Sequence, residues 1–266
     1  MQPVCIVTHR GAPGSDRRAN LDAVLAWLAR SPELDTIVVE QDTHPRLAPP
    51  LPHPGARIVF AYNAGPFNRA WGLNVGARMS TAAVLAFGDA DVVVRGGLAS
   101  AFALCSRQAQ VAKPYRRVID LTAEESARVR EGGPDAYDDG ATSEAGGDIA
   151  RPGKDALCGG WFAMRRSAFE GLGGFDERFA GSGGEDEAMT IKVERARLAT
   201  YELDGGPALR LWRPPAHATA AEGAHFAAGR ALLDEYGRYD DGVLERVAAV
   251  GRQTCGRRDK YRPAER

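Results

Sequence analysis

Two acidic clusters are the residues of this chain whose types and spacing could do chemistry. Asp89 and Asp91 stand one residue apart, just after an apolar run, while Glu185, Asp186 and Glu187 follow the glycine-rich stretch G-S-G-G. Paired carboxylates can hold a hard divalent cation, and a single one can take a proton from a hydroxyl group. The second cluster also has a simpler explanation, because the helix dipole favours acidic residues in a first turn.

The elements predicted around these clusters belong to an α/β fold. Apolar runs at residues 3–8, 36–39 and 56–62 predict three strands, and residues 20–29 predict a helix between the first two. Strand, helix and strand in this order form a βαβ unit, which predicts a parallel sheet. The apolar run at residues 82–87 predicts a further strand that delivers Asp89 and Asp91 to the sheet's carboxyl edge, where ligands bind in such folds.

Downstream of this strand, helices and short strands are predicted to alternate as far as the C-terminus. Pro66 suits the first turn of a helix that continues to about residue 80. Residues 124–155 are rich in glycine, acidic residues and Ser or Thr, which predicts a flexible loop that is either partly disordered or a lid. The other predicted segments are helices at 97–106, 167–172, 185–196, 219–236 and 241–250 and strands at 110–115 and 203–212.

Composition excludes several classes of function. Lys and Arg number 34 against 35 Asp and Glu, so the net charge of -1 argues against a nucleic-acid partner. The four cysteines show neither the spacing of a zinc site nor a disulfide framework, which favours reduced thiols in a cytoplasmic protein. We expect neither a signal peptide nor a transmembrane segment, because the first residues enter a strand pattern at once and no apolar run is long enough.

Six short motifs stand in a characteristic order: Phe67-Asn68-Arg69-Ala70, Leu73-Asn74-Val75-Gly76, Gly88-Asp89-Ala90-Asp91, Gly159-Gly160, Gly173-Gly174-Phe175 and Gly183-Gly184-Glu185-Asp186. Together they resemble the GT-A glycosyltransferases, especially the β-1,4-galactosyltransferase-like branch and its bacterial family 2 type relatives. The resemblance spans residues 3–217. It implies a Rossmann-like nucleotide-binding fold, a three-layer α/β/α sandwich with a mixed, mostly parallel sheet. We expect residues 1–217 to form the catalytic domain and residues 218–266 a C-terminal helical extension.

The resemblance also implies a substrate class. The donor would be a nucleotide sugar carrying UDP or GDP, and the acceptor a sugar or another small molecule. Asp91 would be the direct ligand of a divalent metal, Mn²⁺ or Mg²⁺, and Asp89 would contact ribose or sugar hydroxyls. The implied donor-binding residues are Thr8, His9, Arg10, Glu40, Phe67, Arg69, Asp89, Ala90 and Asp91.

On the acceptor side, the resemblance implies that Glu185 orients the acceptor and that Asp186 acts as the general base. In-line attack would then invert the anomeric configuration, although retaining relatives use a similar acidic motif. The family usually has tryptophan where this chain has Ser182, so acceptor stacking could differ or fall to Trp161. The implied acceptor-binding residues are Trp161, Gly160 and Glu185.

The metal site also departs from the family pattern. The family's metal-binding histidine is expected near residues 210–214, where this chain reads R-L-W-R-P, so His217 is the nearest candidate ligand. An ordinary surface histidine is the alternative. Arg210 or Arg213 could instead contact the diphosphate, because a guanidinium group forms paired hydrogen bonds with phosphate oxygens.

Two other functions remain open. A nucleotidyltransferase would also use carboxylates and a metal, but it would need a basic glycine-rich loop near the first strand, and residues 10–18 contain no lysine. A relative that binds a nucleotide or sugar without turnover would explain the altered residues Ser182 and Arg213. A dinucleotide-dependent dehydrogenase is disfavoured, because no G-x-G-x-x-G follows the first strand.

Overall fold

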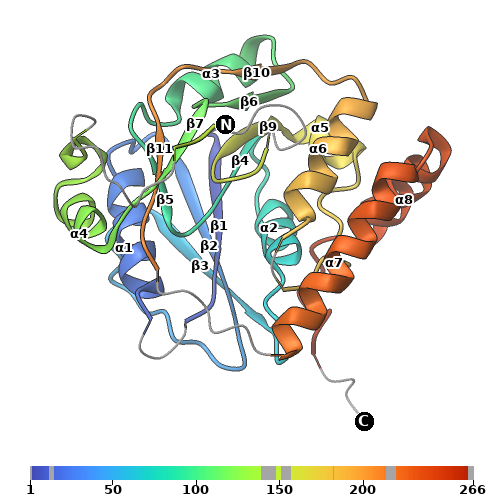
Figure 1. Cartoon of the computed structure of the whole chain (residues 1–266), viewed down its shortest axis with the longest axis horizontal. Helices are drawn as coiled ribbons and strands as arrows, with labels where there is room; N and C mark the ends of the chain where they lie inside the picture. The colour runs from blue at the N-terminus through green and yellow to red at the C-terminus, as the bar shows by residue number, and fades with distance from the viewer. Residues whose placement is uncertain are drawn as a thin grey trace.

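The computed structural model describes residues 2–11, 15–138, 148–150, 157–181, 183–213 and 220–262. A seven-stranded sheet lies at its centre (Figure 1). In spatial order its strands are β10 (Thr200–Glu202), β6 (Val111–Lys113), β9 (Phe162–Arg165), β4 (Val84–Gly88), β1 (Val4–His9), β2 (Asp35–Asp42) and β3 (Ala56–Tyr62). Strand β9 is antiparallel to both neighbours and the other neighbouring pairs are parallel, which confirms the mixed, mostly parallel sheet.

Helices cover both faces of this sheet, because successive residues of its buried strands point to opposite sides. Cys5 and Val7 of β1 pack in the cluster that contains α1 (Arg17–Leu28) and α3 (Ala99–Arg107). Val4 and Ile6 pack in the other cluster, with α2 (Arg69–Arg78), α5 (Arg166–Gly171) and α6 (Glu185–Arg195). The predicted three-layer α/β/α sandwich is confirmed.

A second sheet of four strands was not predicted from the sequence. Its order is β5 (Val92–Val94), β11 (Ala208–Arg210), β7 (Arg117–Asp120) and β8 (Asp148–Ala150). Strands of three or four residues are too short to show an alternating pattern, and β11 is also shorter than the strand expected at residues 203–212. Strand β5 begins directly after Asp91, so this sheet fixes the acidic turn from its far side.

The prediction of a flexible loop from residue 124 onwards is wrong for residues 124–138. Helix α4 (Ala123–Gly132) and a 3-10 turn, η1 (Pro134–Ala136), lie there. The Thr122 hydroxyl accepts a hydrogen bond from the Glu125 amide, and the Glu125 side chain accepts one from the Thr122 amide, which is a capping box. Residues 139–147 and 151–156 of the predicted loop lie outside the described residues.

Helix α2 begins later than predicted, at Arg69 rather than Pro66. Asn68 is its N-cap and accepts a hydrogen bond from the Trp71 amide through its side chain (2.8 Å). Pro66 instead lies in the preceding turn, where its carbonyl accepts a hydrogen bond from the Asn63 side chain (2.9 Å).

The two C-terminal helices, α7 (Ala220–Arg238) and α8 (Asp241–Thr254), lie at the right of Figure 1. Phe179, Ala188, Tyr236 and Leu244 form a third apolar cluster between these helices and α6. The segment after α8 returns to α2, where the Arg257 carbonyl accepts a hydrogen bond from the Trp71 indole (2.8 Å). Within the described ranges, none of the helices has the length and apolar character needed to cross a membrane.

Candidate functional site

The turn that carries Asp89 and Asp91 lies at the carboxyl end of β4, as predicted. The Val92 amide donates to the Asp89 carbonyl (3.4 Å), which closes the turn. The Asp91 carbonyl accepts a hydrogen bond from the Leu211 amide (2.8 Å), which ties the turn to the end of β11. Both backbone contacts leave the two carboxylate side chains to interact with other groups.

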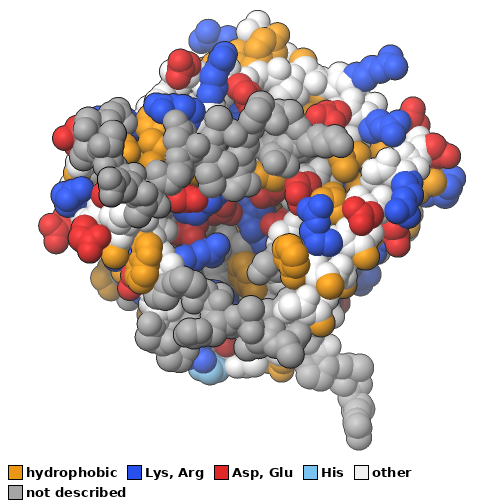
Figure 2. All heavy atoms as spheres, in the orientation of Figure 1, with side chains coloured by type: hydrophobic (Ala, Val, Ile, Leu, Met, Phe, Trp, Pro, Cys, Tyr) orange, Lys and Arg blue, Asp and Glu red, His pale blue; other side chains and the backbone are white. Residues whose placement is uncertain are grey.

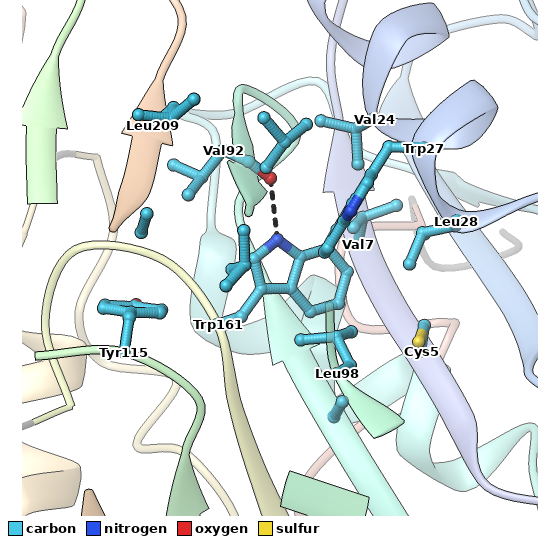
Figure 3. Close-up of a cluster of buried hydrophobic side chains, with 14 of the residues drawn as sticks. Cys5, Val7, Val24, Trp27, Leu28, Val92, Leu98, Tyr115, Trp161 and Leu209 are labelled. Atoms are coloured by element: carbon cyan, nitrogen blue, oxygen red, sulfur yellow. Dashed lines mark hydrogen bonds between the residues drawn. The ribbon is translucent and has the colours of Figure 1, made fainter. Parts of the chain in front are cut away.

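Trp161 supports this turn from the core and has no exposed surface. Its indole donates to the Val92 carbonyl (2.7 Å) and its ring meets the edge of Trp27 (Figure 3). At Gly88 any Cβ atom would collide with the Trp161 ring, so glycine is required there. The proposed acceptor stacking on Trp161 therefore finds no support, because the ring offers no face to a ligand. The backbone of Gly160 is buried against Tyr115 and Val92.

Arg69 joins the two acidic clusters. Its Nε donates to Asp89 Oδ1 (2.7 Å), and its Nη1 donates to Asp186 Oδ1 (2.7 Å) and Glu185 Oε1 (3.3 Å). These side chains are largely buried. Nη2 of Arg69 is also buried and has no hydrogen-bond partner among the described residues, so one donor of the guanidinium group is uncommitted. Figure 2 shows a hollow in the face viewed, where acidic and basic side chains lie next to one another.

Burial and crowding of like charges shift the acidity of this cluster. Burial raises the pKa of Asp186 to about 7; Glu185 and Asp89 act in the same direction, and Arg69 opposes them. The pKa of Glu185 is raised for the same leading reason. Burial alone would lower the pKa of Arg69, but Asp186, Asp89 and Glu185 hold it well above its usual value. Arg69 thus stays charged, while Asp186 can exchange a proton near neutral pH.

Asp91 lies on the side of the turn that faces Arg213. The Nη1 atom of Arg213 is 3.6 Å from Asp91 Oδ2, and the arginine side chain is 60% exposed. Burial and the neighbouring Asp89 raise the pKa of Asp91 to about 6. Arg210 is already engaged with Asp120 (2.7 Å), so of the two arginines Arg213 is better placed to meet an incoming anion.

The donor set near Asp91 fits a metal only if the ligand supplies further oxygens. Across the described ranges, no three His, Cys, Asp or Glu side chains lie together as a metal site. Asp91 offers one hard oxygen ligand, of the kind that Mn²⁺ and Mg²⁺ accept. His217, the second predicted ligand, lies outside the described residues.

The residues predicted at the ends of β1 and β2 also come together, but several are engaged with the protein itself. Arg10 donates to the carbonyls of Gln41 (2.8 Å), Gly65 (2.8 Å) and Asn63 (3.1 Å). Its guanidinium group also lies 5.8 Å from the centre of the Phe67 ring. Arg10 therefore ties the end of β2 to the turn that follows β3, and its charge is shared between these two segments.

Glu40 and His9 are both buried at this edge. Glu40 Oε1 accepts hydrogen bonds from the amides of Arg46 (2.8 Å) and Leu47 (3.0 Å), while Oε2 has no partner among the described residues. Burial raises the pKa of Glu40. For His9, burial, reinforced by Arg18 and Arg17, lowers the pKa to about 4, so this imidazole is neutral at pH 7.

Sequence reasoning missed Gln41, which organises this edge. Its amide nitrogen donates to the Thr8 hydroxyl (2.7 Å) and the Asn68 carbonyl (2.8 Å). Its oxygen accepts from the Asn63 side chain and the Asn68 amide (both 3.1 Å). The available signal was a polar residue inside a strand next to Glu40. Because Asn68 caps α2, Gln41 fixes where the helix carrying Arg69 begins.

Comparison with known families and structures identifies the fold. Residues 150–211 match the family model described as the N-terminal domain of galactosyltransferase. A search of curated proteins finds no match to the chain.

Three solved structures are similar over 94% of this chain. GalNAc-T7 with UDP, GalNAc and Mn²⁺ has a TM-score of 0.56 and 13% identity, and this chain spans 55% of its length. S. aureus TarS 1-349 has a TM-score of 0.55 and 13% identity, with 70% of that chain covered. The Pyrobaculum calidifontis mannosyltransferase PcManGT with GDP-Man and Mn²⁺ has a TM-score of 0.51 and 16% identity, with 73% covered.

These similarities confirm the resemblance deduced from the six motifs at the level of the fold. The segment that matches the galactosyltransferase model includes β9, α5 and α6, and therefore Glu185 and Asp186. This chain has the fold of the GT-A glycosyltransferases.

Proposed function

We propose that this chain is a metal-assisted glycosyltransferase that moves a hexose from a UDP- or GDP-sugar to the hydroxyl group of a sugar or other small-molecule acceptor. The observation that carries the proposal is the meeting of Asp89, Asp91, Arg69, Glu185 and Asp186 at the carboxyl edge of a GT-A sheet. The UDP and GDP-sugar complexes of similar folds support the donor class.

Asp186 is the proposed general base. Its Oδ1 atom accepts the hydrogen bond from Arg69, whereas Oδ2 has no hydrogen-bond donor among the described residues. This leaves Oδ2 able to take the proton of an acceptor hydroxyl as its oxygen attacks the anomeric carbon. A pKa near 7 suits this role, because a base works best when its pKa is near the working pH. In-line attack opposite the leaving diphosphate would invert the anomeric configuration.

Arg69 and Glu185 position the base and the sugar. Arg69 fixes Asp186 relative to Asp89, so the acceptor side and the donor side keep a constant separation. Its uncommitted Nη2 would donate to a donor oxygen. In this proposal Asp91 is the protein ligand of Mn²⁺ or Mg²⁺, whose chemical contribution is to neutralise charge on the departing diphosphate. Arg213 would approach the same phosphates.

The remaining donor roles are proposed from position at the same edge of the sheet. Glu40 lies beside His9 in the paired strands and has a side-chain oxygen without a partner among the described residues, and we assign it to the base or ribose of the nucleotide. We also propose a cytoplasmic location, for which the four free thiols are the support. Residues 1–217 remain our proposed catalytic domain, extended by the helices of 218–266.

The proposal is tested by measuring whether nucleoside diphosphate is released from a panel of nucleotide-sugar donors. UDP- and GDP-hexoses would be incubated with Mn²⁺ and a panel of sugar acceptors, and release of nucleoside diphosphate measured. Wild type should release it with one nucleotide, Asp186→Asn should lower kcat by about 10² or more, and Glu187→Gln should behave like wild type. Glu187 is a matched control because it is the next acidic residue and pairs with Arg230 instead.

The other outcomes favour the alternative functions. Nucleotide binding without release of nucleoside diphosphate from any donor would favour a non-catalytic relative. The close pairing of Asp186 with Arg69 is the structural feature that supports this alternative. Release of pyrophosphate from a nucleoside triphosphate would favour a nucleotidyltransferase. Full activity in Asp186→Asn would remove this residue from the role of base.

A further inference from the structure

A pocket lies away from the acidic cluster, between α8 and the turn that follows α5. It is an open groove of about 720 Å³, which is within the usual range for small-molecule sites. Val243, Val247 and Val250 of α8 form much of its wall, together with Phe175 of the turn. Val250 is 61% exposed, although the rest of α8 packs its apolar residues inward. None of Arg69, Asp89, Asp91, Glu185 or Asp186 lines this groove.

The charged residues of the groove do not balance. Each of its three acidic residues has a cation nearby: Asp176 is 2.6 Å from Arg178, Glu177 is 2.9 Å from Lys260, and Asp259 is 3.8 Å from Arg257. Lys192 and Arg246 also line the groove, and neither has an acidic partner within 4 Å among the residues described. The residues that line the groove therefore carry two more positive than negative charges, although the whole chain has a net charge of -1.

Lys192 is the more unusual of these two residues, because its side chain is buried, with 4% of the residue exposed. Its Nζ donates to the carbonyls of Gly174 (2.8 Å) and Leu172 (3.2 Å). An ammonium group has three N–H donors, so one is not used by these contacts. Burial lowers the pKa of Lys192 to about 8, so the group is still mostly charged at pH 7.

A purely structural role explains only part of this arrangement. Lys192 does satisfy two carbonyls just after α5, where a positive charge is favourable. Both of its hydrogen-bond partners are neutral, however. Asp176 favours the charged form of Lys192, but it forms no ion pair with it within 4 Å and is already paired with Arg178. An anion at the third N–H would therefore offset the cost of burying this charge. A purely structural lysine also does not account for the exposed valine wall or for the unpaired Arg246 on the same groove.

We propose that this groove binds a small amphiphilic anion, whose phosphate or carboxylate group meets Lys192 and Arg246 and whose hydrocarbon part lies along Val243, Val247 and Val250. The positive charge selects the anionic group, and the apolar wall of α8 selects the hydrocarbon. Lys192 lies about two turns of α6, or ~10 Å along its axis, from Glu185, so this is a site of its own. It stands independently of the proposed sugar transfer.

Binding of octyl phosphate by calorimetry at pH 7 tests the proposal. Inorganic phosphate has the anion without the chain, and 1-octanol has the chain without the anion. Octyl phosphate should bind with 1:1 stoichiometry and at least tenfold more tightly than either. Arg246→Gln and Val250→Glu should each weaken it about tenfold, and both positions are exposed enough for the fold to tolerate the change. Lys192→Met should weaken it further if that variant folds.

Two controls locate the binding. Gln253→Glu adds the same charge to an exposed position of α8 outside the groove and should leave affinity unchanged. Asp91→Ala should also leave it unchanged, because a phosphate bound in the acidic cluster would respond to that substitution. The proposal is overturned if octyl phosphate binds no better than both reference compounds, or if Arg246→Gln and Val250→Glu bind it like wild type. Neither result depends on whether the chain transfers sugar.

Discussion

Arg69 is the residue on which the candidate site depends most, because one guanidinium group serves three carboxylates. Burial raises the pKa values of Asp186 and Glu185, and Arg69 lowers them only in part, so both stay above their usual values. An isolated group of buried carboxylates would be strongly destabilising without a counter-ion. The guanidinium group of Arg69 therefore both stabilises the fold against these buried charges and sets the acidity of the proposed catalytic carboxylates.

Replacing Arg69 with methionine should destabilise the protein by about 3–5 kcal/mol at pH 8, because it leaves buried carboxylates without their cation. The loss should shrink towards pH 5.5. Carboxylates whose folded pKa is raised bind more protons when folded, so their cost is present at high pH and disappears as pH falls. Urea unfolding at both pH values measures this.

Arg18→Met is the control for that experiment. Arg18 forms an exposed pair with Asp22, which should contribute less than about 1 kcal/mol. If Arg69→Met were no more destabilising than Arg18→Met, or equally destabilising at both pH values, Arg69 would not be the counter-ion that stabilises the buried carboxylates.

The pKa of Asp186 predicts the pH dependence of the proposed reaction. A general base must be deprotonated, so kcat/KM should fall about tenfold per unit of pH below about 7 and level off above it. The apparent pKa belongs to the coupled carboxylates rather than to one residue. Initial rates between pH 5.5 and 8.5 give the profile, and Glu187→Gln should reproduce it. A flat profile over this range would argue against Asp186 as the base.

At the scale of elements, α2 carries Arg69 and packs closely against β1 and β2. Gly72 and Gly76 make this possible, because a Cβ at Gly72 would collide with Thr8 and Gln41 and one at Gly76 with Ile6. Both glycines are one helical turn apart and face the sheet. The position of Arg69 at the start of α2 thus follows from glycines on its buried face.

Gly72→Ala should therefore destabilise the protein by about 1–3 kcal/mol, the usual cost of overpacking, and should also weaken donor binding by displacing Arg69. Gly223→Ala is the matched control, because Gly223 lies in helix α7 with open space around it. That change should stabilise the helix by up to about 1 kcal/mol. Thermal unfolding of both variants measures the difference, and equal effects would contradict the close approach of α2.

At the scale of the whole molecule, the long buried strands were predictable. Of the short ones, β6 falls within the strand predicted at 110–115 and β11 within the one at 203–212, whereas β5, β7 and β8 were not predicted as strands. Strands β1 to β4 appear in the sequence as apolar runs, and β3 has the predicted bounds, residues 56–62. Strand β5 depends on pairing with β11, in which Val94 lies opposite Ala208. A strand of three residues whose pairing partner lies so far along the chain leaves no recognisable pattern in the local sequence.

The candidate site was predictable in its residues but not in its contacts. The motifs pointed to Arg69, Asp89 and Asp186, yet nothing local links Arg69 to carboxylates 20 and 117 residues away. The prediction that Trp161 stacks on the acceptor finds no support, because the local sequence allows two interpretations. A tryptophan beside two glycines is compatible with a binding site or a core, and only packing against Trp27 and Val92 decides for the core.

The C-terminal helices complete the fold around this site. Tyr261 meets the edge of Trp71, and the Gly256 amide donates to Glu177 (2.6 Å), so the end of the chain braces α2 from outside. Glu177 in turn accepts a hydrogen bond from Asn74 (2.9 Å) in α2. The helix that presents Arg69 is therefore held by the sheet on one side and by the C-terminal segment on the other.

The most direct test of the account is nucleotide binding that depends on both a metal and Asp91. Thermal shift would be measured with UDP and GDP, each with and without Mn²⁺, on wild type and Asp91→Ala. We expect one nucleotide to stabilise wild type only when Mn²⁺ is present, and this shift to disappear in Asp91→Ala. The absence of a shift with either nucleotide, or an equal shift without metal and in the variant, would contradict a metal-assisted nucleotide-sugar site at this edge.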